Sequence, residues 1–234
     1  MNHPEEYHAL VEHQDYQDNL VAAIDEYIGI GGKDILEFGA GTGRLTFKLS
    51  RLAHRVDAFE KYRGMIGTAL SNKEKLGISN CTFRQADNLY LPMLEHEYDI
   101  AIEGWSFFDT ITLSERGWED RNTLIILKRL YNSMVTAVKE GGALVIMESL
   151  GTFTEEPSPD PLFERAIDIL EEGFGFQRKV VRTDFRFGDA GEAKRLLTFF
   201  FGQEAAGKIR KYKDLIIPEC TGIWYRTNDK VFVE

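Results

Sequence analysis

The stretch that decides the fold reads Ile35-Leu36-Glu37-Phe38-Gly39-Ala40-Gly41-Thr42-Gly43-Arg44. A short apolar run ends in three alternating glycines, and an amphipathic run follows. This pattern predicts a buried strand, a tight turn and a helix. Because glycine has no Cβ, the turn can adopt positive φ and a ligand can approach the main chain closely. The unpaired amides at the start of the helix make such a turn suited to binding a nucleotide. The alternative interpretation is an ordinary strand–helix turn without a ligand.

The glycine spacing indicates which nucleotide. The dinucleotide pattern G-x-G-x-x-G accounts for Gly39 and Gly41, but its third glycine position holds Arg44. The run E-x-G-x-G-x-G from Glu37 to Gly43 instead resembles the first motif of class I methyltransferases, which use S-adenosylmethionine. The resemblance covers residues 33–148 and extends more loosely to the end. It implies an α/β fold with a doubly wound, mostly parallel seven-stranded sheet, helices on both faces and an N-terminal helical lid.

The resemblance also implies how the cofactor binds. The turn packs against the ribose and the methionine part, and the acid before the first glycine reaches the cofactor amino group. The implied cofactor-binding residues are Glu37, Gly39, Ala40, Gly41, Thr42, Gly43, Glu60, Lys61, Asp87, Asn88, Glu103 and Gly104.

Alternating short apolar runs and helical patterns predict the same architecture from the residues alone. The patterns predict strands at 34–38, 55–59, 81–85, 98–102, 143–148, 180–187 and 220–226, helices at 5–28, 44–52, 62–76, 121–139, 162–170 and 190–213, and a long loop at 103–116. Residues 44–52 are expected to turn Leu45, Leu49 and Leu52 inward. We expect one domain over 1–234, with a lid at 1–30, a cofactor-binding core at 33–150 and a C-terminal part with a helical insertion at 151–234.

Carboxylates follow the predicted parallel strands at one edge of the sheet. Glu60 closes the second strand, where a carboxylate can accept hydrogen bonds from both ribose hydroxyls. The resemblance implies that Asp87 accepts from the adenine amino group and that the Asn88 amide contacts the ring. The alternatives are a solvated Glu60 and an Asp-Asn turn.

The end of the fourth strand, Glu103-Gly104-Trp105, is expected to face the methionine part and the methyl acceptor. A sulfonium is a cation, so carbonyls, a carboxylate and an aromatic face suit it. Trp105, Phe107 and Phe108 form either an apolar wall or packing beneath a long loop. The candidates for the substrate side are Tyr16, Trp105 and Phe107.

No acid–base constellation is evident, and methyl transfer does not require one because in-line positioning supplies much of the acceleration. If the acceptor must lose a proton, the catalytic candidates, which the sequence does not rank, are Glu103, Asp109, Glu148 and Tyr225.

Composition limits the partners. The 234 residues are 43% hydrophobic and carry a formal net charge of −10, so the average surface repels phosphate backbones. We therefore expect no nucleic-acid binding, and we expect no membrane binding because no apolar run approaches the length needed to span a bilayer. Cys81 and Cys220 form no C-x-x-C pair, so we expect no metal site, and a cytoplasmic location is the default.

The expected reaction is methyl transfer from S-adenosylmethionine to an O, N or other nucleophile on a small molecule, leaving S-adenosylhomocysteine. The place after the fourth strand lacks the N/D-P-P-Y/F motif of base-amine and glutamine methyltransferases, and neither cysteine follows a proline as in cytosine C5 enzymes. Two rival classes remain open at this point. They are a non-catalytic module that binds S-adenosylmethionine and a nicotinamide-dependent oxidoreductase.

Overall fold

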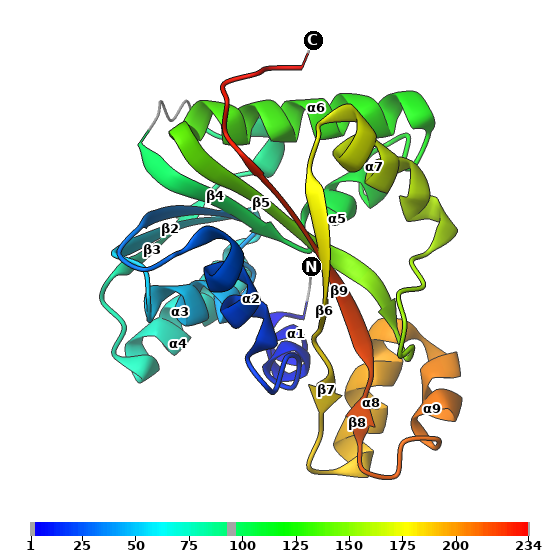
Figure 1. Ribbon diagram of the computed structural model, residues 1–234. Coiled ribbons are helices and arrows are strands. Elements are labelled where there is room, and N and C mark those ends of the chain that lie inside the picture. Colours follow the sequence, from blue (N-terminus) through cyan, green and yellow to red (C-terminus); the bar gives the residue numbers. More distant parts are fainter. Residues whose placement is uncertain (1–2, 93–96, 234) are drawn as a thin grey trace.

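A seven-stranded sheet forms the centre of the molecule (Figure 1). The computed structural model describes residues 3–92 and 97–233. The sheet strands are β1 (Asp34–Phe38), β2 (Arg55–Glu60), β3 (Cys81–Gln85), β4 (Tyr98–Gly104), β5 (Val138–Thr152), β6 (Gln177–Arg182) and β9 (Glu219–Thr227). Their order is β3-β2-β1-β4-β5-β9-β6, and β9 runs antiparallel to both of its neighbours. The predicted mostly parallel, seven-stranded sheet is confirmed.

Helices cover both faces of this sheet, as predicted (Figure 1). The main ones are α2 (Asn19–Ile28), α3 (Arg44–Ser50) and α4 (Arg63–Leu76) on one side, and α5 (Phe107–Thr112), α6 (Asp120–Ala137) and α7 (Glu164–Asp168) on the other. Successive residues of β1 point to opposite faces of the sheet and pack into two different hydrophobic cores. Ile35 packs into the cluster with α2 and α3, whereas Leu36 and Phe38 pack into the cluster with α5 and α6.

The N-terminal segment differs from the single helix predicted over 5–28. It forms α1 (Pro4–Glu12) and α2, and the connection contains Asp15 and Asp18 at φ 56° and 58°. Leu20 and Ile24 of α2 are fully buried in the central core. Of the two helices, α2 is therefore part of the core, and α1 is the one that lies at the carboxyl edge of the strands.

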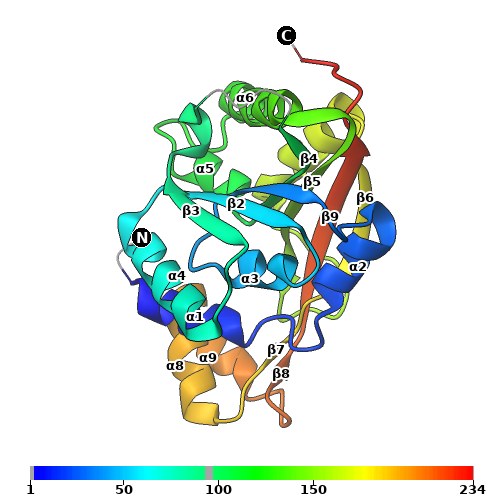
Figure 2. The ribbon, with the colours of Figure 1, turned by 90° about the vertical axis from the view of Figure 1, so that its left-hand side faces the viewer.

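A helical insertion lies between β6 and β9. It comprises β7 (Phe185–Arg186), α8 (Ala190–Phe201), α9 (Gln203–Ile209) and β8 (Ile216–Ile217). The strand predicted over 180–187 is wrong at its end, because the chain leaves the sheet after β6 and β7 pairs with β8. The helix predicted over 190–213 is interrupted at Gly202, which has φ 80°. Figure 2 shows α8 and α9 beside α1, and Leu10 of α1 joins the apolar core of the insertion.

Two further local predictions need correction. The expected loop at 103–116 contains α5, and α3 ends at Ser50, which leaves Leu52 45% exposed instead of buried. The 162–170 segment begins with a 3-10 turn (Pro161–Phe163), continues as α7 and ends in a π-helical turn (Ile169–Gly173). Another 3-10 turn (Asn88–Tyr90) follows β3. Within the described part of the chain, no helix is both long and apolar enough to cross a bilayer.

Candidate active site

The glycine turn after β1 adopts the conformation expected from its sequence. Gly39, Gly41 and Gly43 have φ values of 70°, 58° and 87°, which L side chains rarely adopt. A Cβ on Gly39 would lie 2.3 Å from Cβ of Ser106, and one on Gly41 would lie 3.2 Å from the ring of Tyr7. The turn therefore needs glycine both for its backbone geometry and for close packing against Ser106, which precedes α5, and Tyr7 of α1.

Glu60 joins the ends of β1 and β2. Its buried carboxylate accepts hydrogen bonds from the amides of Gly41, at 2.9 Å, and Tyr62, at 2.7 Å. An ionised carboxylate has about four acceptor positions, so two hydrogen bonds leave room for two more. This geometry fits a role in binding the two hydroxyls of a ribose.

Asp87 and Asn88 lie where β3 ends. The Asp87 carboxylate accepts from the Leu89 amide at 3.0 Å and forms a 2.9 Å ion pair with Lys61. Burial opposes ionisation, but the hydrogen bond from Lys61 lowers the pKa of Asp87 below its usual value. The Asn88 side chain donates to Ser106 Oγ at 3.1 Å. The Asp-Asn turn named as the alternative is thus present, the Asp87 carboxylate remains partly accessible beside it, and contact of Asp87 and Asn88 with an adenine ring stays a prediction.

Glu37 lies on the interior side of β1. Its carboxylate accepts a 2.6 Å hydrogen bond from the Thr46 hydroxyl of α3. Burial raises the pKa of Glu37 to about 7. The structure therefore places this side chain between the sheet and α3, and contact with a cofactor amino group stays a prediction.

Two buried carboxyl groups bind the first amides of α5. Glu103 accepts from the amides of Ser106, at 2.6 Å, and Phe107, at 3.0 Å, while Glu148 accepts from the Phe108 amide at 2.8 Å. Burial raises the pKa of Glu103 to about 7, and burial together with the charge of Glu103 raises the pKa of Glu148 well above its usual value. The pair therefore holds α5 in place and retains a proton near neutral pH.

The substrate-side candidates separate into different environments. Trp105 lies at the end of β4, where its ring faces the Arg44 guanidinium at 5.0 Å. Phe107 is 1% exposed and packs edge-on against Phe38 in the core, so an apolar wall toward a substrate is the wrong interpretation of that residue. The ring of Tyr16 lies 5.4 Å from the Arg186 guanidinium of β7.

The proton-acceptor candidates also separate. Tyr225 stacks on Tyr27 of α2 and donates to Gln177, so the structure does not bring it to the glycine turn. Asp109 is exposed on α5. The carboxyl groups of Glu103 and Glu148 already accept hydrogen bonds from backbone amides, as described above.

A buried polar network that the sequence did not reveal lies beside the turn. Arg44 donates to Gln14 Oε1 at 2.9 Å, and Gln14 Nε2 donates to Glu219 at 2.9 Å. Thr152 also donates to Glu219, at 2.8 Å, and burial raises the pKa of Glu219 to about 7. Of the residues in this network, only Arg44 could be singled out from the sequence, because it directly follows the glycine turn.

Helix α1 is fastened over the turn by His8. The Nδ1 atom of His8 lies 3.0 Å from Thr42 Oγ1, and its Nε2 atom lies 3.0 Å from Asn72 Nδ2 of α4. Tyr7 occupies the same surface beside Gly41, and burial raises its pKa to about 12. The helix thus contacts both the glycine turn and α4.

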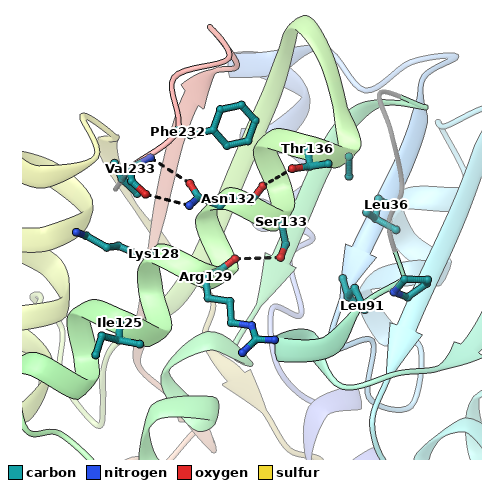
Figure 3. A pocket seen from close by; sticks show the side chains of 12 residues that line it. Leu36, Leu91, Ile125, Lys128, Arg129, Asn132, Ser133, Thr136, Phe232 and Val233 are labelled. Atoms are coloured by element: carbon teal, nitrogen blue, oxygen red, sulfur yellow. Dashed lines mark hydrogen bonds between the residues drawn. The ribbon is translucent and has the colours of Figure 1, made fainter.

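A separate cavity of about 660 Å³ lies beside α6. Figure 3 shows its lining, in which Asn132 exchanges two hydrogen bonds with the main chain of Val233. Leu36, Leu91 and Phe232 give it an apolar character. None of the described residues that line it belongs to the site inferred from the sequence.

Comparison with known proteins identifies the class. A family model described as "Methyltransferase domain" matches residues 31–174, and the chain belongs to this family. An uncharacterized methyltransferase from Anoxybacillus flavithermus is 26% identical over 168 residues, which cover 65% of this chain and 77% of that protein. A protein-L-isoaspartate O-methyltransferase from Rhizobium meliloti is 39% identical over 56 residues, which cover 24% of this chain and only 28% of that relative.

The solved structures show the same fold. A SAM-dependent methyltransferase from Aquifex aeolicus has a TM-score of 0.54 at 18% identity, covering 93% of this chain and 92% of that one. The family membership confirms the resemblance to S-adenosylmethionine-dependent methyltransferases. The chain thus belongs to a family of enzymes that use S-adenosylmethionine for methyl transfer, which favours this class over the two rival classes.

Proposed function

We propose that the enzyme methylates an O, N or other nucleophile on a small-molecule acceptor that binds beneath α1. The observation that carries this proposal is the position of α1, which His8 fastens to Thr42 of the glycine turn. A helix that covers the glycine turn leaves room for a small acceptor and hinders access by a macromolecule. The net charge of −10 also disfavours a nucleic-acid acceptor.

The residues at the strand ends would bind the cofactor. S-adenosylmethionine supplies an electrophilic methyl group on a sulfonium cation. Glu60 would accept from the ribose hydroxyls, and Asp87 would accept from the adenine amino group. The glycine turn and the main chain of Glu103 and Gly104 would line the methionine part, because the Glu103 carboxylate is bound by α5 amides.

One carboxyl group suits removal of an acceptor proton where the acceptor requires it. We retain Asp109, which is exposed on α5, as the candidate general base. Positioning of the acceptor would supply the rest of the acceleration. Within the proposed division of the chain, α1 is the lid of segment 1–30, residues 33–150 hold the cofactor, and 151–234 shape the acceptor side.

Isotope transfer tests the acceptor class. Purified enzyme is incubated with methyl-labelled S-adenosylmethionine and separate small-molecule, protein and nucleic-acid fractions of a cell extract. We expect label in the small-molecule fraction with the wild type and strongly reduced label with Glu60→Ala. Label confined to the protein or nucleic-acid fraction would contradict the proposed acceptor.

A further inference from the structure

Two buried hydrogen-bond donors beside the glycine turn have no acceptor. Among the described residues, Arg44 Nη1 and Trp105 Nε1 are shielded from solvent and make no hydrogen bond. Buried donors in folded proteins are nearly always paired, and leaving a charged donor unpaired is especially unfavourable. Two such donors therefore require an explanation.

The two donors belong to one place in the fold. Arg44 directly follows Gly43 at the end of the β1 turn, and Trp105 directly follows Gly104 at the end of β4. The Arg44 guanidinium lies over the Trp105 ring at 5.0 Å. Trp105 has φ 57°, a conformation that is unfavourable for a bulky residue, and its amide is held by the Met147 carbonyl at 2.8 Å. Strained backbone thus fixes the indole against the guanidinium.

Arg44 also forms no direct ion pair with any described residue. No ion pair within residues 3–92 and 97–233 includes it, and its other terminal nitrogen donates to the neutral side chain of Gln14. Asp15, which lies nearby, is paired with Lys48. Glu219 is close enough to affect the charge of Arg44, but burial keeps this carboxyl partly protonated near neutral pH. The guanidinium remains charged there. Asp15, Glu219 and Glu37 act on its charge, but none of them forms a direct ion pair with it.

We propose that Arg44 Nη1 and Trp105 Nε1 bind the carboxylate of a ligand held between the glycine turn and the end of β4. This inference rests on the proposed function, which places cofactor and acceptor at these strand ends. A carboxylate matches both features, since it accepts two hydrogen bonds and neutralises a guanidinium. Two molecules can supply it: the methionine part of the cofactor, or an acceptor that is itself a small carboxylic acid.

Calorimetry tests the cofactor as the source. Wild type, Arg44→Gln, Arg44→Lys, Trp105→Phe and the exposed-site control Arg51→Gln are titrated with S-adenosylhomocysteine and with 5′-methylthioadenosine, which lacks the amino-acid part. If the cofactor supplies the carboxylate, Arg44→Gln weakens binding of S-adenosylhomocysteine about tenfold or more, because a charged hydrogen bond is lost. Binding of 5′-methylthioadenosine then stays within about twofold, and Arg44→Lys recovers part of the loss.

A second titration tests the acceptor as the source. Protein saturated with S-adenosylhomocysteine is titrated with acetate at constant ionic strength, and tryptophan fluorescence is recorded. If the acceptor supplies the carboxylate, acetate gives a saturable change in the wild type that Arg44→Gln and Trp105→Phe abolish. The variants then bind S-adenosylhomocysteine like the wild type.

The results distinguish failure of the carboxylate site from failure of the proposed cofactor site. If Arg44→Gln and Trp105→Phe match the wild type with all three ligands, the carboxylate site is wrong even though the cofactor binds. If the wild type binds neither adenosine compound, the placement of the cofactor fails first. Trp105→Phe keeps an aromatic ring and removes the Nε1–H donor, so it keeps the test valid if Arg44→Gln does not fold.

Discussion

Replacing Glu148 with glutamine tests the buried carboxyl pair beneath α5. Glu103 is 0% exposed and Glu148 is 4% exposed, and the two groups interact directly. Glutamine keeps an oxygen that can accept from the Phe108 amide, and its amide can donate to an ionised Glu103. The variant therefore preserves the packing while it removes one titrating group and its repulsion.

The expected size follows from proton linkage. The pKa of Glu103 rises from 4.5 to about 7 on folding, chiefly because of burial. The folded protein thus binds protons that the unfolded chain has already released, and stability decreases as pH rises through this range. For one such carboxyl group, the loss between about pH 5.5 and about pH 8 is about 2 kcal/mol. The pKa of Glu148 is also raised, by burial and by the charge of Glu103, so its contribution has the same sign, and we expect Glu148→Gln to reduce the total loss.

Urea unfolding at the two pH values measures the effect. Wild type, Glu148→Gln and the exposed control Glu140→Gln are compared, and the quantity of interest is the decrease in unfolding free energy between the two pH values. Glu37 and Glu219 also have raised pKa values, but their contributions are common to all three proteins. Decreases that agree within about 0.5 kcal/mol for all three would refute the shared buried proton.

Two other predictions concern the turn and its cover. Gly39→Ala places a Cβ 2.3 Å from Ser106 Cβ at φ 70°, so we expect a loss of about 2 kcal/mol or more in urea unfolding, part of which Ser106→Gly recovers in the double variant. Strictly additive effects would show that the contact is not the cause. Deleting residues 1–12 is expected to preserve folding and to speed dissociation of S-adenosylhomocysteine in stopped-flow measurements. An unchanged rate would argue against a lid, whereas deletion of 1–28 should unfold the protein because α2 is part of the core.

The sheet was predictable because its signals are local. β1 and β3 begin and end at the predicted residues. Their bounds follow from the apolar runs, the glycine turn and the glycines between these runs. The break between α1 and α2 was missed because apolar residues resume at Leu20 and Val21 with helical spacing, although residues 13–18 (His-Gln-Asp-Tyr-Gln-Asp) interrupt the apolar stripe. Asp15 fixes that break by accepting from the Leu20 amide and by pairing with Lys48, and the latter contact exists only in the folded chain.

The structure brings several predicted site residues to one edge of the sheet, and their contacts with a ligand stay predictions. Parallel strands that end in carboxylates indicated one edge, and the bond from Gly41 to Glu60 joins two of those ends. The sequence did not indicate that Glu103 binds the amides of α5, because α5 itself was expected to be a loop. It also gave no sign of the contact between Gln14 and Glu219, which are 205 positions apart.

The most direct test of the cofactor site is calorimetric titration of S-adenosylhomocysteine into the wild type, Glu60→Ala, Glu60→Gln and Asp87→Ala, with thermal unfolding as a check on folding. A ribose held by the Glu60 carboxylate predicts a loss of affinity of about tenfold or more for Glu60→Ala, a smaller loss for Asp87→Ala and an intermediate value for Glu60→Gln. Wild-type affinity in both alanine variants would contradict binding of the cofactor at the ends of β2 and β3.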